Sequence, residues 1–244
     1  MMKPIMSLCG LLFLGLLTIV SPAVGESFVK EVQFENHRCL VVNHKNLSSE
    51  APVVFILHGL GANADDLFPL VKKMDLPPSL YVLPDAPIAL GNRAYAWYDF
   101  QKQSREDTVN SRDYLFRLMK HFAEENPAHI RPIIMMGFSQ GGVMSMEAGL
   151  NYPGKVQAIV SMSGYIWDPS QTLKKPLAPK AIPILLIHGG NDMIVTEDWT
   201  EKTVAALQKE GYKPRFVELL MAHQITNDSM AEVSQFLKNV ILHQ

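Results

Sequence analysis

The sequence predicts an α/β fold, with a mostly parallel central sheet and helices on both faces. Two observations lead to this prediction. From about residue 50 onward, short runs of β-branched and other apolar residues alternate with longer amphipathic stretches. That alternation is typical of parallel strands connected by helices. Several of the short runs are apolar at every position, which is expected for strands buried on both faces.

The expected elements follow one another along the chain. Two strands come first, at residues 28–34 and 38–43, and six more follow at 53–57, 80–83, 133–136, 157–161, 184–187 and 215–220. The expected helices are 108–125, 143–150, 197–209 and 229–241. In the first of these helices, Leu115, Leu118, Met119 and Phe122 recur at helical spacing.

Two long loops interrupt this regular pattern, at residues 83–99 and 168–183, and both contain proline. Loops of this length in a compact α/β domain often have a function, so we expect at least one of them to shape a cleft. The alternative for residues 168–183 is a surface excursion without a role. The sequence shows no internal repeat and no second domain.

The first 25 of the 244 residues have the layout of a secretory signal peptide. Lys3 precedes an apolar run at residues 5–20, and Ala23-Val24-Gly25 places small residues where a signal peptidase cleaves. An uncleaved membrane anchor is the alternative, but the apolar core is short for a membrane span and no basic cluster follows it. We therefore expect an exported protein, periplasmic or secreted, whose residues 26–244 form one domain without a stable membrane span.

Charge and cysteine content narrow the possible functions further. The formal net charge of −2 gives no electrostatic reason to expect a nucleic-acid partner. Only Cys9 and Cys39 are present, and Cys9 lies within the expected signal peptide. The mature chain then has one thiol and no internal disulfide. Cys39 lies in an expected strand, where a buried and unreactive thiol is the common case.

The most informative motif is Gly-Phe-Ser-Gln-Gly at residues 137–141, which lies between an apolar strand and a helix. A serine on such a tight turn has a strained backbone, and the flanking glycines remove side chains that would clash. The hydroxyl then projects beyond the sheet. We interpret Ser139 as a nucleophile, because the strand before it and the helix after it make a chance match improbable.

A serine hydroxyl needs a base to accept its proton, and in this arrangement an acid and then a histidine follow along the chain. Asp192 lies in the loop after strand 184–187, and His223 lies in the loop after strand 215–220. The order Ser139, Asp192, His223 is the required one, and all three lie at one edge of the sheet. His188 is the main rival for the base. Asp85, Glu197 and Asp198 are the rivals for the acid.

Residues 58–61, His-Gly-Leu-Gly, follow the strand at 53–57. Acyl transfer requires backbone N–H groups that face the oxygen that becomes negative. The N–H groups of Leu60 and Gln140 would form this oxyanion hole. The alternative is an ordinary strand-to-helix turn, for which glycine is equally suited.

Together these residues resemble the phospholipase/carboxylesterase family that includes acyl-protein thioesterases, a compact branch of the α/β-hydrolases. The resemblance extends from about residue 50 to the end. It rests on residues 58–66, 83–87, 97–99, 137–142, 163–165, 188–192 and His223. It implies an α/β-hydrolase fold with little or no cap, a site that needs no cofactor, and Trp97 near the acyl side of the cleft. Ala222 replaces the glycine usual before the final histidine.

The sequence therefore predicts a serine carboxylesterase that acts on short- to medium-chain esters or lipid-like small molecules, with no metal or other cofactor. An acyl thioesterase or a lysophospholipase is the alternative on the same site. A peptidase is disfavoured because amide leaving groups are harder to expel. From a different class, a non-catalytic binding protein on a hydrolase scaffold is the remaining alternative.

Overall fold

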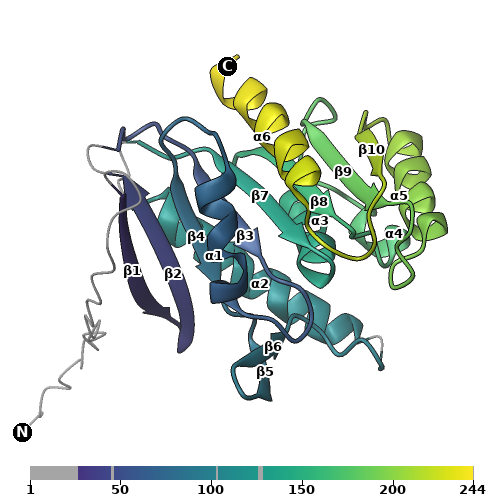
Figure 1. The fold of residues 1–244 in the computed structure, drawn as a ribbon, viewed down its shortest axis with the longest axis horizontal. Coiled ribbons are helices and arrows are strands. Elements are labelled where there is room, and N and C mark those ends of the chain that lie inside the picture. The colour runs from purple at the N-terminus through teal and green to yellow at the C-terminus, as the bar shows by residue number, and fades with distance from the viewer. Residues whose placement is uncertain (1–26, 45–46, 103, 126–128, 244) are drawn as a thin grey trace, which may run out of the picture.

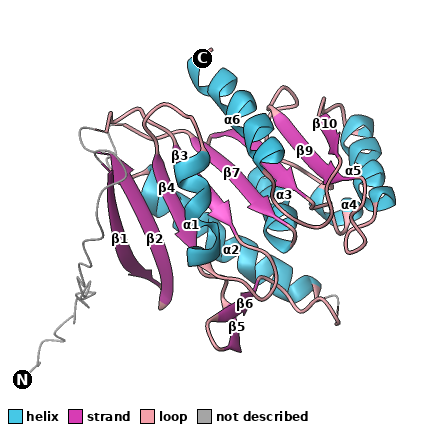
Figure 2. Ribbon diagram, viewed as in Figure 1, coloured by secondary structure: helices cyan, strands magenta, loops and turns pink. Residues whose placement is uncertain are grey.

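The computed structural model of the protein describes residues 27–44, 47–102, 104–125 and 129–243. The predicted signal segment, residues 1–25, lies outside the described residues. The described part forms an eight-stranded sheet with helices on both faces, together with a separate two-stranded hairpin (Figures 1 and 2). Within these residues no helix combines the length and the apolar character needed to cross a membrane.

The strands of the large sheet lie in the order β1-β2-β4-β3-β7-β8-β9-β10. They are β1 (Ser27–Phe34), β2 (His37–His44), β3 (Val53–Leu57), β4 (Leu80–Pro84), β7 (Ile133–Phe138), β8 (Val156–Met162), β9 (Ile184–Gly189) and β10 (Arg215–Leu219). Strand β2 pairs antiparallel with β1 and β4, and the pairs from β4 through β10 are parallel. The predicted, mostly parallel sheet is confirmed. Its parallel strands therefore direct their carboxyl ends to one edge.

The helices divide between the two faces. They are α1 (Ala64–Lys73), α2 (Arg105–Ala123), α3 (Gln140–Asn151), the short α4 (Pro169–Thr172), α5 (Glu197–Lys209) and α6 (Asn227–Leu242). The helices α2, α3 and α5 contribute side chains to one hydrophobic cluster, and α1 and α6 contribute to the other. Figure 2 shows α1 and α6 crossing in front of the sheet, with α2 and α3 behind it.

Strand β3 shows why the central strands are apolar at every position. Val53, Phe55 and Leu57 pack into the cluster with α2, α3 and α5, whereas Val54 and Ile56 pack into the cluster with α1 and α6. All five side chains are buried. Neighbouring residues of a strand point to opposite faces of the sheet. Because helices cover both faces here, every position of a central strand is buried and polar residues do not alternate with apolar ones.

Four elements were not predicted from the sequence. Helix α1 contains Pro69, which removes one hydrogen bond from the helix interior. The loop at residues 83–99 contains the hairpin of β5 (Ile88–Gly91) and β6 (Ala94–Ala96). Helix α4 lies within the loop at residues 168–183.

Cys39 is fully buried on β2, where its Sγ lies 3.9 Å from the Tyr114 hydroxyl. Burial raises the pKa of this thiol to about 12. Because the thiolate is the reactive form, the side chain has a packing role, as the sequence predicted.

Candidate active site

Ser139 lies on the predicted sharp turn between β7 and α3. Its backbone has φ 54° and ψ −120°, a conformation that costs a non-glycine residue about 1–3 kcal/mol. The Ser139 N–H donates to Met162 O at 2.8 Å and so ties the turn to β8. A Cβ atom on Gly137 would lie 2.2 Å from Gly141 O, and one on Gly141 would lie 2.1 Å from Leu57 O. The turn therefore requires both glycines, as predicted.

The structure brings the three predicted triad residues into one hydrogen-bonded chain. His223 Nε2 lies 2.9 Å from Ser139 Oγ, and His223 Nδ1 lies 2.8 Å from Asp192 Oδ2. A carboxylate can only accept, so Nδ1 carries the proton and Nε2 is free to accept from the serine hydroxyl. Each residue follows a different parallel strand (β7, β9 and β10), and the residues meet at the carboxyl edge of the sheet.

The loop after β9 holds the Asp192 carboxylate in a fixed orientation. Its Oδ1 accepts from the N–H groups of Ile194 and Val195, both at 2.9 Å, and its side chain is fully buried. Burial favours the neutral acid, but the hydrogen bonds from His223 and from the two N–H groups outweigh it and lower the pKa of Asp192. Asp192 is thus ionised at neutral pH and faces the imidazole.

The rival residues are engaged elsewhere. His188 is fully buried, and its Nδ1 lies 3.1 Å from the Thr200 hydroxyl on α5. Burial also lowers the pKa of His188. Among the rival acids, Asp85 forms an ion pair with Arg38, and Asp198 forms one with Lys202. The remaining rival, Glu197, has its pKa raised by a hydrogen bond shared with Glu218.

Two backbone N–H groups beside Ser139 are free to bind an oxyanion. Leu60 and Gln140 line the same cleft as Ser139 and His223. Neither of their N–H groups donates a hydrogen bond to another residue that the structure describes. Gln140 is the first residue of α3, where unpaired N–H groups and the helix dipole favour negative charge. Its side chain is anchored, because Oε1 accepts from Trp97 N–H and Nε2 donates to Tyr98 O.

The cleft at Ser139 has a volume of about 540 Å³ and is open to solvent. Its walls are mostly aromatic and aliphatic, and include Leu67, Tyr98, Phe100, Phe138, Tyr165 and Trp199. Asp66 is the one carboxylate among the described lining residues. The volume lies within the range of small-molecule sites, and the lining favours an uncharged apolar group.

Trp97 does not line this cleft, contrary to the expected contact with substrate. Its side chain is fully buried, and its Nε1 donates to His58 O at 2.9 Å. Trp97 therefore supports the loop after β3 from behind, whereas its neighbour Tyr98 lines the cleft. The exposure of an aromatic ring depends on the path of the hairpin before it, which the sequence did not reveal.

Other lining residues were missed because no motif marks them. Phe100, Ile194 and Trp199 lie in loops or on a helix face, and reach the cleft through tertiary packing. Tyr98 and Tyr165 could have been suspected, because each lies within a segment that resembles the family.

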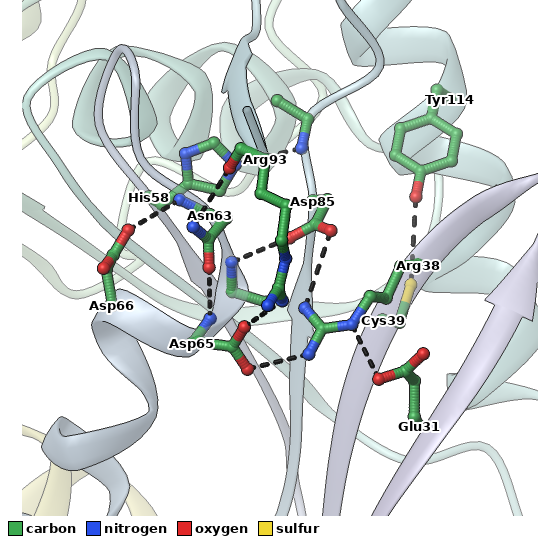
Figure 3. Close-up of polar contacts among 12 residues, drawn as sticks. Glu31, Arg38, Cys39, His58, Asn63, Asp65, Asp66, Asp85, Arg93 and Tyr114 are labelled. Atoms are coloured by element: carbon green, nitrogen blue, oxygen red, sulfur yellow. Dashed lines mark hydrogen bonds and ion pairs between the residues drawn. The ribbon is translucent and has the colours of Figure 1, made fainter. Parts of the chain in front are cut away.

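A charged network supports the start of α1 beside the cleft (Figure 3). Arg38 donates to Glu31 and to Asp65, both at 2.7 Å, and lies 3.6 Å from Asp85. Arg93 also pairs with Asp65. Within the described part of the chain, no three His, Cys, Asp or Glu side chains are placed to hold a metal ion.

Comparisons with known proteins agree with this geometry. The sequence model described as phospholipase/carboxylesterase matches residues 37–241. An acyl-protein thioesterase 1 homolog from Dictyostelium discoideum is 29% identical, over 77% of this chain and 91% of its own. The acyl-protein thioesterase 1 of Mycosarcoma maydis is 28% identical, over 84% and 97%. The solved acyl-protein thioesterase 2 of Zea mays superimposes with a TM-score of 0.70 at 23% identity, over 84% and 99%, and supports the fold.

Proposed function

Because the chain belongs to the phospholipase/carboxylesterase family, we propose that it hydrolyses short- to medium-chain carboxylic esters through an acyl-enzyme on Ser139. The chain is a serine hydrolase of the α/β-hydrolase superfamily. This disfavours the alternative of a non-catalytic binding protein. The observation that supports the specific proposal is the hydrogen-bonded chain of Ser139, His223 and Asp192 at the base of an apolar cleft.

In the first half of the reaction, His223 Nε2 accepts the Ser139 proton while Oγ attacks the ester carbonyl carbon. Asp192 stabilises the imidazolium that forms and keeps its orientation. The N–H groups of Leu60 and Gln140 donate to the carbonyl oxygen as it becomes negative. His223 then gives its proton to the leaving alkoxide, the carbon–oxygen bond breaks, and the acyl group remains on Ser139.

The second half repeats these steps with water. His223 removes a proton from water, the resulting hydroxide attacks the acyl carbon, and the same two N–H groups stabilise the second tetrahedral intermediate. Return of the proton to Ser139 Oγ releases the carboxylic acid. In both halves His223 is the protein group that accepts and returns the proton, and it lies 2.9 Å from Ser139 Oγ.

The acyl preference follows from the apolar lining of the cleft. Each CH₂ group transferred from water to such a surface contributes about 0.8 kcal/mol, or roughly a fourfold rise in kcat/KM. A series of p-nitrophenyl esters should show this rise from acetate through the medium chain lengths, followed by a plateau or fall. A maximum at palmitate would contradict the proposed chain length.

Ser139→Ala and a fluorophosphonate label test the chemistry itself. The wild type should form a covalent adduct at Ser139 and lose all turnover, whereas Ser139→Ala should bind no label. If the variant keeps wild-type turnover, the proposed function is wrong.

Thioester hydrolysis is the second candidate, and the names of the curated relatives favour it. The same site can expel a thiolate, which is a better leaving group than an alkoxide. An oxygen ester and a thioester with the same acyl chain separate the two possibilities. We expect the oxygen ester to be turned over with a kcat/KM at least comparable to that of the thioester.

Turnover should not depend on a metal ion, because His223 and backbone N–H groups fill the roles of base and oxyanion binder. Overnight dialysis against EDTA should leave kcat unchanged, as measured beside an undialysed sample. Loss of activity that zinc restores would show that a metal takes part.

A further inference from the structure

The loop between β3 and α1 is held by hydrogen bonds on both sides of Leu60. Trp97 Nε1 donates to His58 O at 2.9 Å. Further on, Gly61 N–H donates to Tyr95 O at 2.8 Å, and Tyr95 N–H donates to Ala62 O at 3.1 Å. The Leu60 N–H lies between these bonds and has no partner among the described residues.

The Gly59 carbonyl, which belongs to the same peptide unit as this N–H, is hydrogen-bonded to His58 and accepts a longer bond of 3.2 Å from Ala62 N–H. The His58 imidazole is fully buried, with Nδ1 2.7 Å from Gly59 O and Nε2 3.0 Å from Ala86 N. Because the Ala86 N–H can only donate, Nε2 must be the acceptor. Nδ1 therefore carries the hydrogen and donates to the Gly59 carbonyl. Burial lowers the pKa of His58, which favours the neutral ring that this bonding needs.

The Gly59 carbonyl and the Leu60 N–H belong to the same peptide unit. That unit is planar and trans, so its C=O and N–H point in opposite directions. The bond from His58 Nδ1 to the carbonyl therefore leaves the N–H directed away from the imidazole, and Leu60 lines the same cleft as Ser139. A bond to the carbonyl also polarises the N–H and makes it a stronger donor.

We propose that His58 is a positioning residue of the reaction, which fixes the Leu60 N–H as an oxyanion donor through its bond to the Gly59 carbonyl. This inference rests on the proposed function, in which the Leu60 N–H binds the oxyanion. His58 itself touches neither the substrate nor the reacting atoms.

The Ala86 N–H on the other side of the imidazole follows Asp85, which forms an ion pair with Arg38 (Figure 3). Asp85 is buried; its N–H donates to Arg38 O at 2.8 Å, and its Oδ1 accepts from Ala64 N–H at 2.8 Å. The residue that follows, Ala86, supplies the N–H that fixes the His58 tautomer. The buried Asp85 thus connects the start of α1, at the end of the loop that carries Leu60, with the Ala86 N–H that binds His58.

Two substitutions separate the two hydrogen bonds of His58. His58→Asn places an amide nitrogen where Nδ1 stood, so it keeps the donor to Gly59 O and loses the acceptor for Ala86. His58→Gln places its amide near Nε2, so it keeps the acceptor and loses the donor. Leu118→Ala, which truncates a buried core side chain of α2, serves as the control for a general loss of stability.

The measurements are kcat, KM, Tm and the affinity for a trifluoromethyl ketone, whose adduct with serine carries the oxyanion. We expect His58→Gln to lower kcat roughly 10²-fold with KM little changed, and to lower the affinity for the trifluoromethyl ketone by a similar factor. His58→Asn should stay within about tenfold of wild type. Leu118→Ala should lower Tm but leave kcat per folded molecule unchanged.

Equal effects of His58→Asn and His58→Gln on kcat would overturn the proposal, as would a fall in Tm alone. If neither variant folds, the imidazole ¹⁵N spectrum of the wild type decides. A neutral Nδ1–H ring between about pH 5 and 9 supports the proposal, and an Nε2–H ring or an imidazolium overturns it. If the wild type labels at Ser139 but His58→Gln keeps its full kcat, this inference is wrong and the proposed function still holds.

Discussion

Both carboxylate oxygens of Asp192 are in use, one by His223 and the other by two backbone N–H groups. The carboxylate therefore cannot rotate away from the imidazole without breaking the loop that carries it. At the scale of single residues, orientation of this kind determines which ring nitrogen of His223 faces Ser139.

Asp192→Asn should lower kcat on the order of 10³–10⁴-fold. The asparagine amide can donate to Nδ1, and the ring then adopts the tautomer whose Nε2 cannot accept the serine proton. Steady-state kinetics measures the loss, and circular dichroism confirms that the variant is folded. The matched control is Asp198→Asn, at an exposed ion pair with Lys202, which should leave kcat nearly unchanged. The reverse result would show that the acid was assigned to the wrong residue.

The lowered pKa of Asp192 also predicts a pH-dependent stability. A carboxyl group that is more acidic in the folded state stabilises the fold above its unfolded pKa of about 3.9, and this contribution is lost as pH falls through the folded-state value. Urea unfolding of wild type and Asp192→Asn should therefore show a stability difference at pH 7 that shrinks below about pH 4. A difference that is constant with pH would contradict the assignment.

The triad could be predicted from sequence because chain order and strand ends determine where its members meet. The position of Trp97 could not, because burial of an indole depends on how the β5–β6 hairpin folds over it. His58 was visible only as part of a glycine-rich turn. Its role depends on the Ala86 N–H, which comes from a different strand end.

At the scale of elements, the turn between β7 and α3 depends on close backbone packing. Gly141 lies against the end of β3. The turn that carries Ser139 and the loop that carries Leu60 are therefore in direct contact through main-chain atoms. The strain at Ser139 is maintained because β7 and α3 are buried on all sides.

Gly141→Ala should abolish the native turn, because its Cβ would lie 2.1 Å from Leu57 O and neither backbone can move aside. We expect little soluble, active protein. Gly211→Ala is the matched control, because Gly211 has φ 86° but open space around it. That substitution should cost about 1–2 kcal/mol of unfolding free energy and leave kcat intact. Equal behaviour of the two variants would show that the close approach to Leu57 O does not limit the turn.

The elements that sequence reasoning missed have weak local signals. Pro69 in the middle of α1 argues against a helix, yet the Asn63–Asp66 capping box and the burial of Leu67 and Leu70 offset that cost. Strands β5 and β6 span four and three residues, too few for a periodic pattern. The five central strands β3, β4, β7, β8 and β9 were found because their runs are apolar and separated by turn residues.

At the scale of the whole molecule, the family match covers residues 37–241. Removal of residues 1–25 and export of the protein are proposals that rest on the signal-peptide pattern of the sequence.

The exported protein should begin at Glu26, which mass spectrometry of the purified product measures. Small side chains at Ala23 and Gly25 fit the signal peptidase, so Gly25→Leu should block processing. Val24→Leu, at the position between them, is the control and should be cleaved normally. Exported wild-type protein that still begins at Met1 would contradict the prediction.

Leu60, on the loop after β3, and His223, after the last strand, come from opposite ends of the domain. The nucleophile stands between them, 84 residues before its base. Catalytic power consequently appears only once the first and last parts of the domain are both in place. A nascent chain that lacks the last strand and its loop would therefore not hydrolyse esters. Turnover per molecule therefore measures the fraction of chains that have folded completely. Recovery of esterase activity after dilution from urea should lag behind the return of the helical circular dichroism signal.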